Sequence, residues 1–167
     1  SLYLLLSLAI ICVIIFLTAC TKDKTEQNPT AGLTRITEGY VAGAGAKVED
    51  YTIETSLTTG YTKFYLALYD SVTGKRIEDA HIHLTPTMNM GMMQHNAPFE
   101  NPASTEAVDH LFPCSVTFIM SSMGGAWTLE IEVHNHTNDK EGSITIPLTI
   151  AEPAVSRQKS FTASHNG

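Results

Sequence analysis

The chain has 167 residues, with 10 Lys and Arg against 17 Asp and Glu, and a formal net charge of −7. An acidic chain lacks the basic patch that nucleic acid requires, so we expect no nucleic-acid partner. Its length allows for one domain of common size once the ends are set aside. The acidic balance favours cationic ligands.

Residues 2–19 are nearly all apolar and uncharged, and they end in Leu17-Thr18-Ala19 directly before Cys20. This small-residue cleavage pattern resembles a bacterial lipoprotein signal. It predicts a signal peptide over 1–19 and a lipid on the Cys20 thiol, with the body outside the cytoplasm. The alternative is a permanent helical anchor, because the run is long enough to span a bilayer. A basic segment is missing and the chain opens at Ser1, so we expect further residues before it.

Residues 20–46 are polar or small, and they predict a flexible tether between the lipid and the domain. The folded domain is then expected over residues 47–151. Residues 152–167 are a tail, or the start of a missing second domain. Cys114 is the only thiol left in the body, so no internal disulfide can form, and its position before an apolar run favours burial over reactivity.

Alternation of period two predicts strands along the body, and no stretch has a helical period over three turns. The expected strands are residues 51–57, 64–69, 80–84, 114–120, 127–133 and 143–150, with turn signals at 70–74, 121–125 and 138–142. Pro86 is expected to end its strand, and Pro147 to put the last strand at an edge. Six or seven short strands indicate an all-β protein, an antiparallel immunoglobulin-like β-sandwich.

Residues 85–112 are expected to form one long irregular loop, a feature that is often functional in a small domain. Its main feature is a cluster of thioethers followed by an imidazole: Met88, Met90, Met92, Met93 and His95. Copper(I) prefers these soft ligands. Methionine also fills gaps in cores, but the neighbours of this cluster are polar and lack an apolar period. The pattern therefore predicts a copper site in the loop.

Two pairs of histidines lie outside this cluster. If the strand at 80–84 turns its aliphatic residues inward, His81 and His83 both face out, about 7 Å apart, and we expect them to complete the copper site. His134 and His136 continue the outward phase of Glu132 and form a second candidate site, suited to copper(II) or zinc. The alternative for this second pair is a solvated strand end.

Four segments together resemble the YtkA-like domain, which is related to FixH proteins. They are residues 64–74, residues 77–84, the cluster from Met88 to His95, and residues 118–131. The resemblance covers about residues 62–133. It implies a copper-resistance-protein-like, immunoglobulin-type sandwich that handles copper through the Met/His loop, with Gly125 and Trp127 as the glycine and tryptophan of the family's last motif. The chain departs from the family in one extra residue before Trp127 and in Lys75-Arg76-Ile77, where the family has a proline.

No arrangement of residues points to catalysis, so we do not expect an enzyme. We expect a lipid-anchored extracytoplasmic protein that binds copper, as copper(I), for storage, resistance or delivery to a cuproenzyme. It would lie on the periplasmic or cell-surface side of the outer membrane. The alternative is an interaction module without metal, whose methionine loop contacts a membrane partner such as an outer-membrane transporter.

Overall fold

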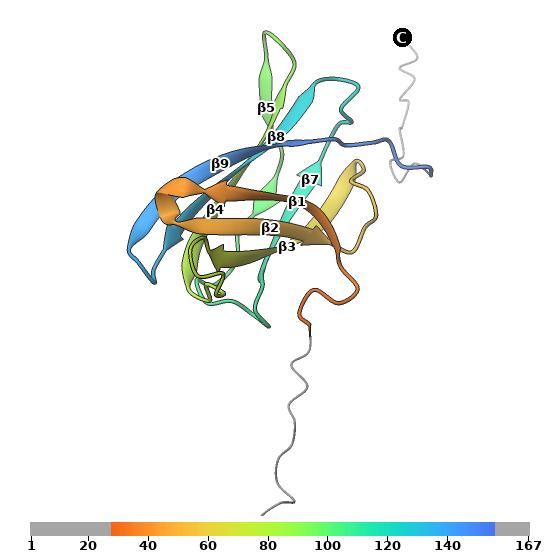
Figure 1. Ribbon diagram of the computed structural model, residues 1–167. Helices are drawn as coiled ribbons and strands as arrows, with labels where there is room; N and C mark the ends of the chain where they lie inside the picture. The colour runs from red at the N-terminus through yellow and green to blue at the C-terminus, as the bar shows by residue number, and fades with distance from the viewer. Residues whose placement is uncertain (1–27, 156–167) are drawn as a thin grey trace, which may run out of the picture.

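The computed structural model of the chain describes residues 28–155 (Figure 1). The predicted signal peptide, the lipidation site at Cys20 and the tail beyond residue 155 lie outside the described residues. Among residues 28–155, no helix is long and apolar enough to span a membrane.

Two antiparallel sheets pack face to face, so the prediction of an all-β antiparallel sandwich is confirmed. The strand order is β1-β2-β3-β7-β6 in one sheet and β5-β4-β8-β9 in the other. Of the nine described strands, β1, β5 and β6 were not predicted, and β2 was predicted only in its last two residues. The elements are β1 (Thr34–Val41), the 3-10 helix η1 (Ala42–Ala44), β2 (Ala46–Thr52), β3 (Gly60–Asp70), β4 (Ala80–Asn89), β5 (Gln94–Asn96), β6 (Phe99–Glu100), β7 (Phe112–Phe118), β8 (Ala126–Asn135) and β9 (Lys140–Leu148).

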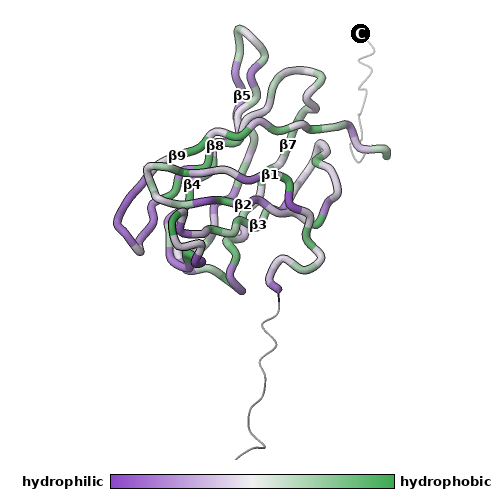
Figure 2. Tube along the Cα trace, in the orientation of Figure 1, coloured by the Kyte–Doolittle hydropathy of each residue, from purple (hydrophilic) through white to green (hydrophobic). Residues whose placement is uncertain are grey.

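The core lies between the sheets and is built by strand alternation, which Figure 2 shows as changes of hydropathy along each strand. On β8 the inward residues from Trp127 to Val133 are buried, as predicted. Phe118 of β7 meets Trp127 edge-on, with ring centroids 5.3 Å apart. The indole N–H of Trp127 donates to the Met120 carbonyl oxygen at 2.9 Å, so this side chain is satisfied while buried.

The predicted tether is wrong from Thr34 onward, because this segment forms β1 and η1 and enters β2. β1 pairs with β2 from Thr34 opposite Thr52 to Val41 opposite Ala46. Val41 and Ala44 are buried in the core. The strand predicted at 51–57 is wrong for most of its length, because only Tyr51 and Thr52 belong to β2 and Ile53 is 64% exposed. The small residues of this segment suggested a linker, but in the structure they let β1, η1 and β2 pack closely.

β4 continues through Pro86 to Asn89, so the expected end at Pro86 is wrong. The carbonyl oxygen of Pro86 accepts from the Ala97 N–H at 3.1 Å, on the side away from β8. The nitrogen of a strand residue points to the same side as its carbonyl, so the missing N–H costs no bond to β8. The segment predicted as one irregular loop therefore contains the end of β4, β5 and β6. Pro147 lies in edge strand β9, as predicted.

The core contains one carboxyl group without a partner, that of Asp50 on the inward face of β2. The residue is 0% exposed, and neither of its oxygens accepts a well-formed hydrogen bond. Burial raises the pKa of Asp50 well above its usual range, because a charged group is poorly solvated there. The nearby Cys114 is buried and free, as predicted, and burial raises the pKa of its thiol.

We predict that Asp50 makes the fold less stable as pH rises. A carboxyl whose pKa is raised on folding holds its proton in the folded state, so stability is highest below the unfolded value of about 4 and falls as pH climbs toward the folded pKa. Urea unfolding between pH 4 and pH 8 should show a shallower decline for Asp50→Asn than for the wild type. Parallel curves would contradict this role.

Candidate functional site

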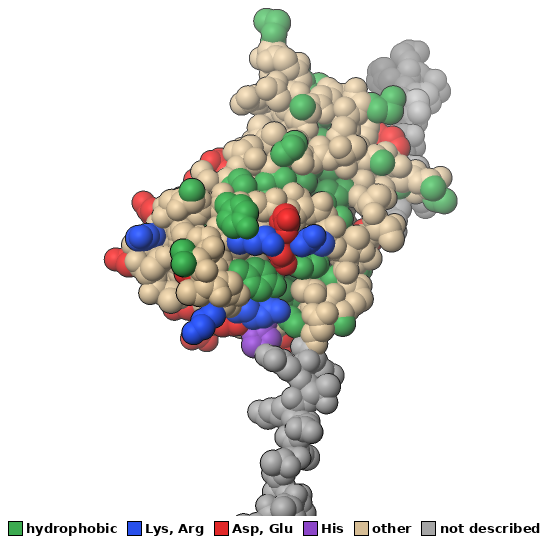
Figure 3. Space-filling view, in the orientation of Figure 1, with side chains coloured by type: hydrophobic (Ala, Val, Ile, Leu, Met, Phe, Trp, Pro, Cys, Tyr) green, Lys and Arg blue, Asp and Glu red, His purple; other side chains and the backbone are tan. Residues whose placement is uncertain are grey.

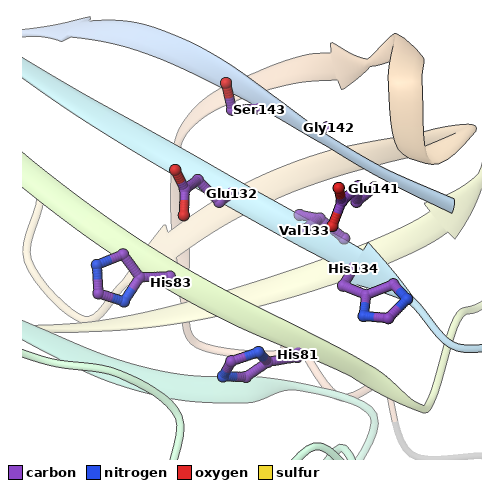
Figure 4. A pocket seen from close by; sticks show the side chains of 8 residues that line it. All are labelled: His81, His83, Glu132, Val133, His134, Glu141, Gly142 and Ser143. Carbon is purple, nitrogen blue, oxygen red and sulfur yellow. The ribbon is translucent and has the colours of Figure 1, made fainter.

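The register of β4 with β8 brings histidines from two strands onto one outer face. His81 lies directly opposite His134, and His83 directly opposite Glu132. Cβ atoms of opposed residues lie about 5 Å apart. The outward phase of all four was predicted. They line a shallow depression of about 600 Å³ that reaches Ser143 of β9 (Figure 4).

His83 is held by a contact that works against metal binding. The Asn101 side-chain oxygen accepts from the Leu84 N–H at 2.9 Å, so the amide nitrogen of Asn101 is the group that meets His83 Nδ1 at 2.8 Å. Nδ1 of a neutral His83 is then an acceptor and its proton lies on Nε2. Phe99 also packs edge-on against the ring, at 5.5 Å between centroids. His83 thus helps to hold the segment around Asn101 against β4.

His134 and His136 have the opposite arrangement, in which carboxylates take one nitrogen and leave the other free. His134 Nε2 lies 3.1 Å from Asp139 Oδ1, and His136 Nδ1 lies 2.8 Å from Asp79 Oδ1. A carboxylate on one ring nitrogen is the usual second partner of a metal-binding histidine. The two rings meet edge-on, with centroids 5.0 Å apart. We call His81, His134 and His136 the histidine cluster.

The sequence did not reveal the partners of these rings. Asp79 lies just before β4 and Asp139 in the β8–β9 turn, and only the fold brings them to His136 and His134. A third such pair is His110 Nδ1 with Glu78 Oε1, at 2.8 Å. His110 was interpreted as loop surface, and it is exposed. The available signal was the excess of acids on the segments that flank β4 and β8.

The methionines of the predicted loop do not share one environment. Met88 is the last inward residue of β4 and is 0% exposed, so the prediction that it lies in an open loop is wrong. Met90 is half-buried against the core. Met92 and Met93 lie at the tip of the β4–β5 hairpin, 101% and 57% exposed. His95 pairs with Met88 across the hairpin and is exposed.

The expectation that His81 and His83 complete the methionine site is also wrong. The hairpin continues the line of β4 away from the sandwich (Figure 1). At the rise of a strand, Met90 lies about 30 Å from His81 and about 23 Å from His83. Thioethers and imidazoles therefore lie at opposite ends of the β4–β8 pair.

All six methionines gather at one end, which we call the methionine end: Met88, Met90, Met92, Met93, Met120 and Met123. Its two segments, the β4–β5 hairpin and the β7–β8 turn, meet at Gly124 and Gly125. A Cβ placed at Gly124 would be 3.2 Å from the terminal methyl carbons of both Met88 and Met120. A Cβ at Gly125 would lie 3.1 Å from Met90 Cγ. Because glycine has no side chain, Met88, Met90 and Met120 can pack directly against this turn.

The histidine cluster needs side-chain movement to hold an ion. Among residues 28–155, no three His, Cys, Asp or Glu side chains converge on one point. His81 is exposed and His134 half-exposed, and exposed side chains change rotamer in picoseconds to nanoseconds. The fixed element is the backbone register, which keeps His81 and His134 on one face, and the His136 ring, just beyond β8, packs edge-on against His134.

Comparison with family models, with curated proteins and with solved structures gave no match. The resemblance to the YtkA-like domain therefore stays a prediction drawn from the sequence.

We predict that Met88 and Met92 differ sharply in their contribution to stability. Met88→Ala leaves a core cavity and should lower the free energy of unfolding by about 2–5 kcal/mol. Met92→Ala removes an exposed side chain and should change it by less than about 0.5 kcal/mol. Urea unfolding of both variants measures the difference, and equal effects would place Met88 outside the core.

Proposed function

We propose that this protein is a lipid-anchored extracytoplasmic metal-binding protein, with copper as its ion. The signal-like residues 2–19 and Cys20 support the anchor. The observation that carries metal binding is the β4–β8 register, which gathers imidazoles on one outer face. Storage, resistance and delivery to a cuproenzyme are all compatible with such a site.

The histidine cluster suits copper(II), with zinc as its competitor. Imidazole nitrogens bind both ions, and copper(II) binds most tightly among the divalent first-row metals. Deprotonated rings are needed, so affinity falls in acid. Asp79 and Asp139 hold two of the rings with one nitrogen free.

Charge around the cluster supports a cationic ligand. Glu132 and Glu141 line the same depression, and the carboxylates of Asp79 and Asp139 lie against the rings. The chain as a whole has a formal charge of −7. An acidic rim raises the local concentration of a divalent cation and stabilises it once bound.

We predict about one copper(II) per chain at the histidine cluster. His134→Gln and His136→Gln should each raise the Kd at least 10-fold, because each removes a ligand that is already held by a carboxylate. His95→Gln, an exposed histidine at the far end, is the matched control and should leave the Kd unchanged. Calorimetric titration of the full chain measures all three, with nitrogen couplings in the electron paramagnetic resonance spectrum as a second readout. Wild-type affinity in both His134→Gln and His136→Gln would contradict this site.

The methionine end is a second candidate place for copper, in its reduced form. The terminal methyl groups of Met88 and Met120 both reach Gly124, and Met90 lies beside the adjacent Gly125. Thioethers stay neutral and suit copper(I). A shallow depression of about 290 Å³, lined by Met120 and Gly124, opens Met120 to solvent, while Met88 lies buried behind it.

We predict that any copper(I) bound here depends on the inner methionines. Met88→Leu/Met120→Leu keeps the apolar volume and should abolish uptake from a competing chelator. Met92→Leu/Met93→Leu, at the hairpin tip, should bind as the wild type does. If only Met92→Leu/Met93→Leu loses uptake, the site lies at the hairpin tip instead. If the wild type takes up no copper(I), the methionine end is not a copper site.

The alternative function is an interaction module that needs no metal. Met92 is 101% exposed and Met123 is 92% exposed, both at the methionine end. Flexible, polarisable side chains of this kind suit adaptable protein contacts. A membrane partner that is captured equally well with a copper chelator present, by a protein that purifies without metal, would favour this alternative.

A further inference from the structure

The outer face of the other sheet has a chemistry that metal binding does not use. The five tyrosines among the described residues all lie on it: Tyr40, Tyr51, Tyr61, Tyr65 and Tyr69. We call this surface the tyrosine face. Figure 3 views it over β1 and β2, with charged side chains between hydrophobic ones.

Strand register arranges the tyrosine face in rows. Lys47 of β2 lies opposite Tyr40 of β1 and opposite Tyr69 of β3. Neighbouring strands are about 4.8 Å apart, so the two tyrosines stand about 10 Å apart across Lys47. In the next row Glu49 faces Ala67, whose small side chain leaves space between Tyr65 and Tyr69.

A depression of about 410 Å³ results, lined by Tyr40, Lys47, Glu49, Tyr69, Asp70 and Ser71. Tyr40 is 64% exposed, and Tyr69 is half-buried with the Arg76 guanidinium 5.2 Å from its ring centroid. One ring at the rim is therefore free to cover a ligand, and the other is fixed by a cation–π contact.

The charges beside the depression cancel. Lys47 Nζ lies 2.8 Å from Glu38 and 2.7 Å from Glu49, and Arg35 lies 2.9 Å and 3.3 Å from the same two carboxylates. The hydrogen bonds that the Lys47 ammonium donates to Glu38 and Glu49 raise the pKa of Lys47. Desolvation acts to raise the pKa of Glu49, but Lys47 and the Tyr51 hydroxyl outweigh it and lower the pKa overall. Lys47, Arg35, Glu38 and Glu49 thus form a neutral set of fixed donors and acceptors, to which Asp70 in the lining and Arg76 on the Tyr69 ring add one formal charge of each sign.

We propose that the tyrosine face binds a neutral saccharide chain, with one sugar residue in the depression between Tyr40 and Tyr69. A sugar ring has an apolar C–H face that stacks on an aromatic ring and edge hydroxyls that both donate and accept. The Lys47–Glu49 pair offers both kinds of partner, and hydrogen bonds to charged groups are the stronger ones. A charged ligand would gain little net electrostatic attraction here, because the charges of this set cancel. The interface core of a protein partner would be depleted of charge, whereas this centre is charged.

Electrophoresis of the full chain through gels that contain neutral polysaccharides tests the proposal. The panel is amylopectin, xyloglucan, arabinoxylan, galactomannan and laminarin, with polygalacturonate as the charged comparison. At least one neutral polysaccharide should retard the wild type. The double variant Tyr40→Ala/Tyr69→Ala should raise the Kd for that polysaccharide at least 10-fold. Tyr61→Ala is the matched control, since Tyr61 is 62% exposed on β3 and does not line the depression, and it should bind normally.

Ser71→Trp gives an independent reading if the double variant does not fold. Ser71 is exposed in the turn after β3, so a bulky side chain there fills the depression without disturbing the core. The same loss of retardation is expected. The proposal is overturned if no neutral polysaccharide retards the wild type, if only polygalacturonate does, or if Ser71→Trp and the double variant bind as tightly as the wild type. The metal-binding variants leave this face intact, so the two proposals fail separately.

Discussion

The ten-residue antiparallel register between β4 and β8 is the constraint on which the rest of the molecule depends. It puts Met88 opposite Trp127 inside the sandwich and His81 opposite His134 outside it. Side chains alternate with a period of two, so a slip of one residue would expose the aliphatic set and bury the imidazoles. Core burial therefore fixes the histidine cluster: the hydrophobic gain of the inward residues holds the outward ones in place.

Local alternation predicted much of the fold and the facing of the imidazoles. The phase of residues 80–84 and 127–133 was enough to turn His81 and His134 outward. Which histidine meets which is a matter of register between two strands, with His81 and His134 53 residues apart in the sequence, and one strand alone contains no such information. The carboxylates that hold His134 and His136 are also non-local or lie in turns, so the sequence could not identify which ring nitrogens stay free.

The failures have a shared physical cause, because composition was interpreted without its tertiary context. Pro86 predicts a strand end only if its missing N–H is needed by a neighbouring strand, and here it faces away from β8, toward Ala97 just beyond the short strand β5. Met88 seemed to lack apolar partners because its partners, Trp127 and Met120, come from β8 and the β7–β8 turn. Residues 34–46 suggested a linker, yet Val41 and Ala44 are buried. The tyrosine face left a trace in the sequence, since Tyr61, Tyr65 and Tyr69 share one strand parity.

The two outer faces of the sandwich are chemically independent. Stacked sheets lie about 10 Å apart, and the space between them is filled by side chains that touch neither ligand. On the histidine face, Glu132 and Glu141 have no Lys or Arg partner among residues 28–155, so this face favours a positive ion. On the tyrosine face, Lys47 and Arg35 pair with Glu38 and Glu49, and this balance favours a neutral ligand. A β-sandwich suits this division, because each strand contributes alternate residues to a common core and to one surface. Selection can change a surface residue on β2 or β8 with little cost to the core beneath it.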